Sequence, residues 1–274
     1  MLIGLGWDKV LLNIINKLTL WLVLFLLLLS LNAHCIAENN AQTSSFLNKI
    51  RENHKKIKNY TAMVYSEEIK GERIQKRLVR SYFSIPWLLR NEIVAGTEPA
   101  DAGSEMIYAG GEKMTGHKGG MVSFATVSLY YDSPMATTLL GLTFREMIMK
   151  AMLDRLSLYE KLGTIEFGQD QQAGLQTVSV LRLRLHKDVI LPEHDRIGKI
   201  GATHEEIYID KERLIPVGWA IYVDKTRVRM LILEKLLTNV PLDADIFQQV
   251  RLKKPQYIEL NKLFPPREWR PDYW

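Results

Sequence analysis

The chain has 274 residues, a net charge of +5 and a single cysteine, Cys35. A nucleic-acid-binding protein usually carries a dense stripe of Lys and Arg, whereas the basic residues here alternate with acids, as on an ordinary solvated surface. Because Cys35 precedes the expected folded body, that body has no disulfides, cysteine nucleophiles or cysteine-ligated zinc.

Residues 1–37 have the pattern of an export signal. Lys9 and Lys17 precede an apolar run from Leu18 to Leu31, which is shorter than the about 20 residues that a membrane-spanning helix needs. A small-x-small cleavage site, Cys35-Ile36-Ala37, follows the run. The sequence therefore predicts a cleaved signal peptide and a mature protein in the periplasm or cell envelope. The alternative is an uncleaved anchor in the inner membrane, because further apolar residues lie between Val10 and Ile15.

An amphipathic helix is expected at the start of the body. The polar segment from Glu38 to Ser45 is a tether, and Ser44 or Ser45 can cap a helix that runs to about Lys58. Its apolar residues recur at helical spacing, which predicts one buried side: Phe46, Leu47, Ile50 and Ile57.

A series of strands is expected next. Stretches of β-forming residues are separated by turn residues at intervals of about eight to twelve, without helical patterns between them, which indicates an antiparallel meander. The expected strands are Tyr60–Ile69, Arg73–Phe83, Trp87–Val94, Glu105–Ala109, Lys113–His117 and Val122–Tyr131.

The segment after these strands has the clearest helix signal. Thr143 to Glu146 form a T-x-x-E capping box, and Leu142 can pack against Met147. An apolar stripe continues towards Gly163, so the sequence predicts one continuous helix from Thr143 to about Leu162. The methionines of this helix indicate either a face that adapts to irregular contents or the ordinary filling of core gaps.

Further strands complete the body. They are expected at Thr164–Gln169, Gln176–Lys187, Glu205–Ile209, Val217–Val223 and Arg227–Leu237. The residues between Asp188 and Thr203 are expected to form a loop. Together the patterns predict roughly eleven strands in one α+β domain over residues 38–250, a strongly curved antiparallel sheet covered by amphipathic helices.

Motifs of catalysis are missing from the sequence. It contains no G-x-S-x-G, no phosphate-binding loop, no dinucleotide-binding glycine pattern and no H-E-x-x-H. One polar cluster is a candidate metal site if its loop folds back, although a solvated loop and strand end explains it better: Glu193, His194, Asp195, His204, Glu205 and Glu206. The sequence therefore favours a binding module, without metal, cofactor or nucleic acid, over an enzyme.

The last part of the body carries a family resemblance. The stretches ATHEEIYIDKERLIPVGWAIYVD and VRMLILEKLLTNVPLDADIF resemble the closing half of the LolA-like superfamily, the outer-membrane lipoprotein-sorting proteins and their relatives. Asp210, Pro216, Asn239 and Phe247 occupy the family's positions. Asn tolerates the turn conformation that ends the last strand, which leaves Phe247 free to cover an apolar edge of the sheet. The earlier stretch GSEMIYAGGEKMTGHKGG resembles an uncharacterised domain-of-unknown-function family of bacterial envelope proteins in the same group.

This resemblance implies an open half-barrel with a lid of helices and a lipid or lipoprotein acyl chain inside. Carriers of the family latch the lid with a buried arginine, for which the sequence gives no position. The candidate lining of the apolar interior is Met63, Tyr65, Trp87, Leu89, Ile107, Met147, Leu183, Trp219, Ile221, Leu231 and Leu233.

Two functions follow from these expectations. The first is a carrier or sensor of a lipid or lipoprotein acyl chain. The alternative is an envelope-stress signalling module that binds a regulator protein through an exposed apolar surface. The C-terminal extension, residues 251–274, is rich in aromatic and basic residues, which are compatible with a strap across the barrel or with contact to a membrane surface.

Overall fold

The computed structural model describes Trp21 and residues 42–120, 123, 125–174, 176–191 and 195–248. The predicted signal peptide and the C-terminal extension therefore lie outside the described residues. The chain forms two units, Met1–Lys49 and Ile50–Trp274, and a helix over residues 42–55 spans their junction.

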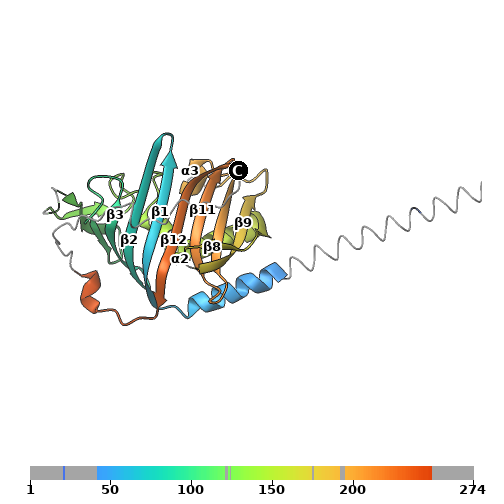
Figure 1. Ribbon diagram of the computed structural model, residues 1–274, viewed down its shortest axis with the longest axis horizontal. Coiled ribbons are helices and arrows are strands. Elements are labelled where there is room, and N and C mark those ends of the chain that lie inside the picture. The colour runs from blue at the N-terminus through green and yellow to red at the C-terminus, as the bar shows by residue number, and fades with distance from the viewer. Residues whose placement is uncertain are drawn as a thin grey trace, which may run out of the picture. The chain divides into compact units, whose positions relative to one another are not determined.

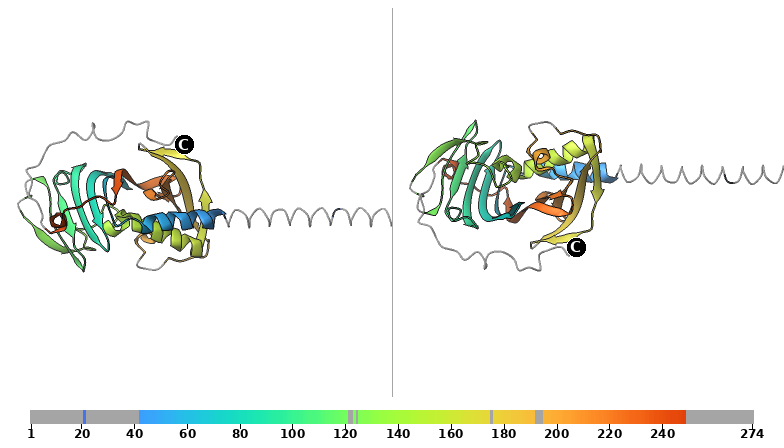
Figure 2. Two further views of the ribbon diagram at one scale, coloured as in Figure 1. Left: turned by 90° about the horizontal axis from the view of Figure 1, so that it is seen from below. Right: turned by 90° about the horizontal axis from the view of Figure 1, so that it is seen from above.

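The described part of the second unit is built on a 12-stranded antiparallel sheet (Figure 1). Its order is β6-β5-β4-β3-β2-β1-β12-β11-β10-β9-β7, and β8 pairs with β9. Because β6 and β7 end this order, the sheet is open, and Figure 2 shows its curvature. The strands are β1 (Asn59–Lys70), β2 (Arg73–Ser84), β3 (Leu88–Gly96), β4 (Glu105–Tyr108), β5 (Lys113–His117), β6 (Val127–Tyr130), β7 (Gly163–Phe167), β8 (Gln171–Ala173), β9 (Gln176–Leu185), β10 (His204–Asp210), β11 (Pro216–Val223) and β12 (Thr226–Thr238). The predicted fold class, an open and curved antiparallel α+β half-barrel, is confirmed.

One face of the sheet contacts the helix α2 (Met149–Leu162), which packs against β7, β9 and β11. We call this the covered face. Side chains alternate between the two faces along a strand, and paired residues on neighbouring strands share a face. Trp219 pairs with Leu231, which pairs with Ser66, so all three lie on the covered face.

The covered face is mostly apolar at β9–β12, whereas at β1–β3 it mixes apolar and polar side chains. In the first region the fully buried residues include Leu181, Leu183, Ile207, Ile209, Leu231 and Leu233. In the second region the buried residues of this face include the polar Ser66, Glu68, Gln75, Ser81 and Asn91 together with the apolar Tyr60, Val64, Val79, Phe83 and Leu89. The two regions therefore hold their cover by different kinds of contact.

The predicted helix from Thr143 to Leu162 is wrong in one respect, because it is broken. The capping box is present, with Thr143 N–H donating to Glu146 Oε2 over 2.6 Å, but it caps a short 3-10 helix, η2 (Phe144–Met147). Ile148 then adopts an extended conformation, with φ −100° and ψ 158°, and α2 begins at Met149. The break turns the chain so that Ile148 and Met149 are buried while Met147 is only half-buried.

The predicted loop between Asp188 and Thr203 is also wrong in part, because it contains the short helix α3 (Arg196–Ile200). Asp195 caps this helix by accepting hydrogen bonds from the backbone N–H groups of Ile197 and Gly198, at 2.9 and 3.0 Å. Asp at this position is a strong helix-starting signal, but a helix this short has too little apolar periodicity to be predicted.

The exit of the last strand agrees with the sequence prediction. Asn239 has a left-handed backbone with φ 54°, and its side chain accepts from Lys58 N–H over 2.8 Å and donates to Lys56 O over 3.0 Å. Beyond it, the 3-10 helix η3 (Ala244–Phe247) lies against β3, where Arg90 Nη1 donates to Ile246 O over 3.0 Å. Phe247 is buried there.

Candidate functional site

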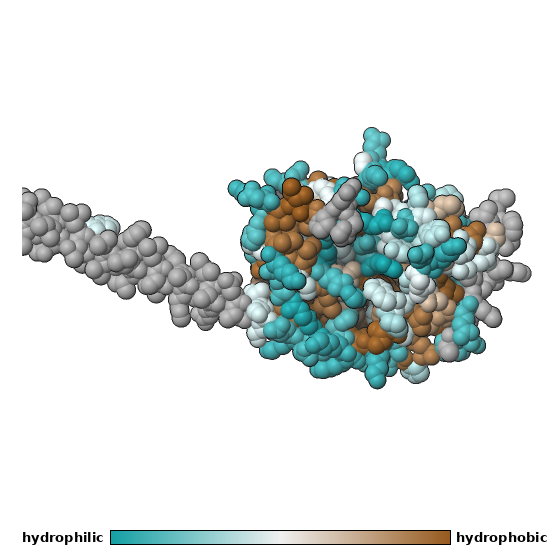
Figure 3. Space-filling model, turned by 180° about the vertical axis from the view of Figure 1, so that it is seen from behind, coloured by the Kyte–Doolittle hydropathy of each residue, from teal (hydrophilic) through white to brown (hydrophobic). Residues whose placement is uncertain are grey.

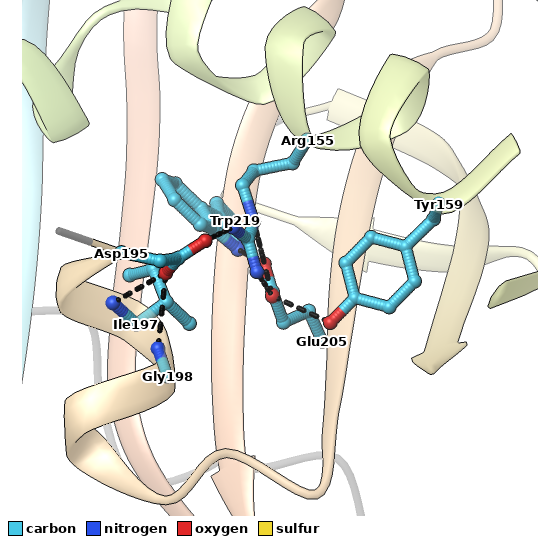
Figure 4. A network of polar contacts seen from close by, with 7 residues as sticks. All are labelled: Arg155, Tyr159, Asp195, Ile197, Gly198, Glu205 and Trp219. Atoms are coloured by element: carbon cyan, nitrogen blue, oxygen red, sulfur yellow. Dashed lines mark hydrogen bonds and ion pairs between the residues drawn. The ribbon is translucent and has the colours of Figure 1, made fainter. Parts of the chain in front are cut away.

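A buried carboxylate, Glu205 on β10, is the centre of a polar network between the sheet and α2 (Figure 4). Its side chain is 0% exposed. Arg155 Nε donates to each carboxylate oxygen over 3.1 Å, and Arg155 Nη2 forms a further contact. Tyr159 Oη donates to the same carboxylate over 2.7 Å and Trp219 Nε1 over 2.9 Å. Every donor comes from a side chain, so Glu205 links α2 to β11 through side chains alone.

Local geometry explains why these residues meet. Arg155 and Tyr159 are four residues apart in α2 and therefore lie on the same side of the helix. Glu205 pairs with Ile221 on β11, and Trp219, two residues before Ile221, shares its face. The helix and the strand pair thus present the three donors to one carboxylate.

The network continues from Arg155 to α3. Arg155 Nη1 lies 2.6 Å from Asp195 Oδ2, and Asp195 also caps α3. Next to it, Arg196 Nη1 donates to Gly141 O over 2.7 Å. Arg155 is therefore the contact through which α2, α3 and β10 are held together.

A second buried arginine, Arg229 on β12, holds the segment that precedes α2. Its side chain is 1% exposed, and Nη2 donates to the backbone carbonyl of Glu146 over 2.8 Å. Arg229 Nε lies 3.7 Å from Glu68 Oε1, and the guanidinium lies 4.9 Å from the centre of the Trp219 ring. Glu68 Oε2 in turn accepts from Leu140 N–H over 3.0 Å. These contacts fix residues 140–146 to β1 and β12.

Burial shapes the ionisation of these groups. Burial alone lowers the pKa of Arg155, but the carboxylates of Glu205 and Asp195 outweigh it and raise that pKa above its usual range. Burial, followed by the charge of Glu205, raises the pKa of Tyr159, so its hydroxyl stays protonated and donates. Burial lowers the pKa of Arg229, since its contacts with carboxylates are longer. Removing one partner of a buried ion pair typically costs about 3–5 kcal/mol, because the other charge is left unpaired.

Eleven residues are predicted from the sequence to line an apolar interior. The structure brings five of them together on the covered face of β9–β12. These are Leu183, Trp219, Ile221, Leu231 and Leu233, each 0% exposed. In this conformation these five side chains are therefore closed off from solvent.

The other lining candidates lie elsewhere. Leu89 is on the covered face of β3, because it pairs with Phe83, which pairs with Tyr60. Met63 and Tyr65 lie on the opposite face, since they flank Val64, which pairs with the covered residue Leu233. Ile107 also lies on the opposite face, because it pairs with Arg90, the neighbour of Leu89 in β3. Met147 is in η2, and Trp87 lies in the turn before β3, where the Arg145 guanidinium is 5.6 Å from its ring.

The polar cluster proposed as a metal site is divided between the two faces. Glu193 and His194 lie outside the described residues. Asp195 and Glu205 bind Arg155 on the covered face, whereas Glu206 accepts from Arg182 on the opposite face, over 2.9 Å. Among the described residues, no group of three or more His, Cys, Asp or Glu side chains is placed to hold a metal ion.

Sequence reasoning missed Arg155, Tyr159, Arg229 and Glu68. A signal was present in the strand alternation, because Glu205 is followed two and four residues later by Ile207 and Ile209, which are core residues. Arg229 likewise precedes Leu231 and Leu233 on the same face. When every second residue of a strand is apolar except for one charged residue, that residue indicates a buried ion pair or a binding site.

No helix in the described ranges combines the length and hydrophobicity needed to cross a membrane. No family model matches the sequence, and no curated protein matches it either.

Solved structures match this chain at low similarity. The lipoprotein LppX from Mycobacterium tuberculosis has 10% identity and a TM-score of 0.44, over 74% of this chain and 99% of LppX. A LolA superfamily protein from Nitrosomonas europaea has 9% identity and a TM-score of 0.33, over 75% of this chain and 97% of its own. In the MucA/MucB complex from Pseudomonas aeruginosa, one chain has 10% identity and a TM-score of 0.40, over 76% of this chain and 61% of that chain. One of these structures is of a protein from the superfamily that the sequence resemblance named. None of them shows what this chain binds.

Proposed function

We propose that this protein is a non-enzymatic binding protein of the periplasm or cell envelope, which takes up a lipid or lipoprotein acyl chain on the covered face of β9–β12 when α2 moves away. The observation that carries this proposal is the combination of an apolar sheet face with a cover held by a compact polar latch. That latch consists of Arg155 and Tyr159 on α2 with Glu205 and Asp195.

When α2 moves away, water can replace the polar contacts of the latch but not the apolar contacts beneath it. Water can satisfy Arg155, Glu205 and Tyr159 when they separate, so the loss of their mutual bonds is partly offset. Water cannot replace the apolar contacts of Leu231 and Leu233, because exposing apolar surface costs about 25 cal/mol per Å². An acyl chain can cover that surface, with a gain of about 0.8 kcal/mol per buried CH₂ group. The open state is therefore stabilised by an apolar chain more than by water.

Uptake of a fluorescent fatty-acyl probe tests this proposal. The wild-type protein is expected to take up the probe, and Leu231→Gln to lose uptake, because the substitution places an amide on the surface that receives the chain. Glu205→Gln weakens the latch and is expected to speed uptake at temperatures where circular dichroism shows an intact fold. Wild-type protein that takes up no probe at any concentration below the probe's solubility contradicts the proposal.

The proposed location has its own test. If the predicted signal peptide is removed, N-terminal sequencing of protein from the cell envelope should begin near Glu38. An intact Met1 in the membrane fraction would instead support the inner-membrane anchor.

The alternative function, binding of a regulator protein, has separate support at the β6 end of the sheet. Val127 and Tyr130 on β6 are 41% and 53% exposed, and Met135 beyond the strand is 64% exposed. An end strand offers unpaired backbone groups to an incoming strand of another protein. Elsewhere, the face in Figure 3 carries apolar side chains in separate patches with polar ones between them. A photo-crosslinking residue at Tyr130 that captures one protein in cells, when no acyl probe binds, would favour this alternative.

A further inference from the structure

Arg229 is a buried guanidinium with unused hydrogen-bonding capacity. Among the described residues its one hydrogen bond runs from Nη2 to the backbone carbonyl of Glu146, and its buried Nε and Nη1 atoms have no hydrogen-bond partner. Burying such donors without acceptors is costly, because their hydration is lost and nothing replaces it. The position therefore holds donors that a ligand can use.

The charges around Arg229 decide which acceptor suits these donors. Three acidic residues surround the guanidinium, Glu68 on β1, Glu146 on η2 and Glu205 on β10. Glu205 is paired with Arg155, and Glu68 is 3.7 Å from Arg229 Nε. A further anion brought to this position would meet the negative charges of Glu68 and Glu205, which repel it. The acceptor that fits is an uncharged oxygen, as the Glu146 carbonyl is.

Arg229 also lies beside the apolar surface of the proposed function. It shares the covered face of β12 with Leu231 and Leu233, and its guanidinium lies over the Trp219 ring. An acyl chain lying along these residues would bring its own carbonyl group within reach of Arg229.

We propose that Arg229 binds the carbonyl oxygen of an uncharged acyl ester, so that the protein selects acyl esters over free fatty acids. This inference rests on the proposed function, because it requires an acyl chain on the covered face. When α2 moves away, Arg229 keeps the Glu146 carbonyl on Nη2, and its Nε and Nη1 atoms still have no hydrogen-bond partner among the described residues. A hydrocarbon that fills the opened space excludes water, so the ligand itself must then supply the missing acceptor.

A ligand series on the wild-type protein tests the inference without any substitution. Three competitors of equal chain length displace the fluorescent acyl probe: a methyl ester, the corresponding alkyl methyl ether, and the free acid at pH 8. The ether lacks only the carbonyl acceptor, so the ester should compete about tenfold or more better, as expected for a hydrogen bond to a charged group. The free acid should also compete less well than the ester, because its carboxylate meets Glu68 and Glu205.

Substitutions assign the preference to Arg229. Arg229→Lys keeps the charge but removes the forked donors, and it should reduce the advantage of the ester over the ether to less than about threefold. Arg182→Lys is the matched control, since Arg182 pairs with Glu206 on the opposite face, and it should leave the advantage unchanged. Melting curves show whether each variant folds; if Arg229→Lys does not, the ligand series on the wild-type protein still decides.

Two sources of the ester are distinguished by two further competitors, a short-chain diacylglycerol and a peptide that carries a diacylglyceryl cysteine. The competitor that binds more tightly identifies a membrane glycerolipid or a lipoprotein as the source. Each competitor should also bind more tightly than its ether-linked analogue. Equal affinity for esters and ethers, with the probe still taken up, overturns this inference and leaves the proposed function standing. A wild-type protein that takes up no probe overturns both.

Discussion

The two regions of the covered face hold the cover by different mixtures of contacts. At β9–β12 the sheet presents apolar side chains to α2, and the one carboxylate among them, Glu205, is satisfied by Arg155, Tyr159 and Trp219. At β1–β2 the same face carries polar side chains beside apolar ones, and two of the polar ones bind backbone groups of the cover. Glu68 accepts from Leu140 N–H over 3.0 Å, and Gln75 accepts from Leu139 N–H over 3.4 Å.

This difference indicates which part of the cover is able to move. Apolar contacts are non-directional, so a helix resting on them can shift and an acyl chain can replace it. Hydrogen bonds to backbone amides fix one geometry, so residues 139–140 are held in register on β1 and β2. The extended residue Ile148 separates η2 from α2, so it lies between the segment that hydrogen bonds fix and the helix that is able to shift.

The largest expected effect is on the latch. Glu205→Ala should lower the free energy of unfolding by about 3–5 kcal/mol, because Arg155 is left buried without its main partner. Chemical denaturation measures this loss. Glu166→Ala on exposed β7 is the control and should change stability by less than about 0.5 kcal/mol. Equal effects of the two substitutions would mean that the latch does not stabilise the fold.

The apolar region should respond to loss of volume. Leu231→Ala is expected to cost about 2–5 kcal/mol, since a fully buried leucine leaves a cavity that its neighbours only partly fill. Leu237→Ala on the same strand is the control, because Leu237 is 59% exposed and should cost less than about 0.5 kcal/mol. A small effect at Leu231 would show that the region is loosely packed already, and thermal melting of both variants decides between these outcomes.

The polar region should respond to loss of charge. Glu68→Gln retains an acceptor for Leu140 N–H but removes the carboxylate nearest to Arg229 Nε, so we expect a loss of about 2 kcal/mol. The double variant Glu68→Gln with Arg229→Gln should lose less than the sum of the two single variants, because the pair is removed together. Strict additivity in denaturation experiments would argue that the two side chains do not interact.

The smallest expected effect is at the start of η2. Thr143→Ala removes the hydroxyl that accepts from Arg145 N–H over 3.2 Å, which should cost about 1 kcal/mol. Thr143→Ser retains the hydroxyl and should restore most of this stability. If both variants melt at the wild-type temperature, the capping box contributes nothing measurable to the fold.

The sequence by itself determined the features that depend on neighbouring residues. Eleven strands and their antiparallel arrangement follow from β-forming stretches and turns, and the structure adds the short β8 and the pairing of β1 with β12. The capping box at Thr143 and the left-handed turn at Asn239 were also predictable, because in each case the side chain acts on backbone within a few residues or on its own backbone.

Only the tertiary structure decided which face of a strand is covered and which distant charges meet. Met63 and Tyr65 alternate in β1 with Ala62 and Val64, and both sets are apolar enough to be buried, so alternation alone gives no face. Arg155 lies 50 residues from Glu205 and 40 from Asp195, and no spacing in the sequence links them. They meet because α2 returns across the sheet after the break at Ile148. A buried ion pair between such distant residues depends on the packing of whole elements, which local propensity does not encode.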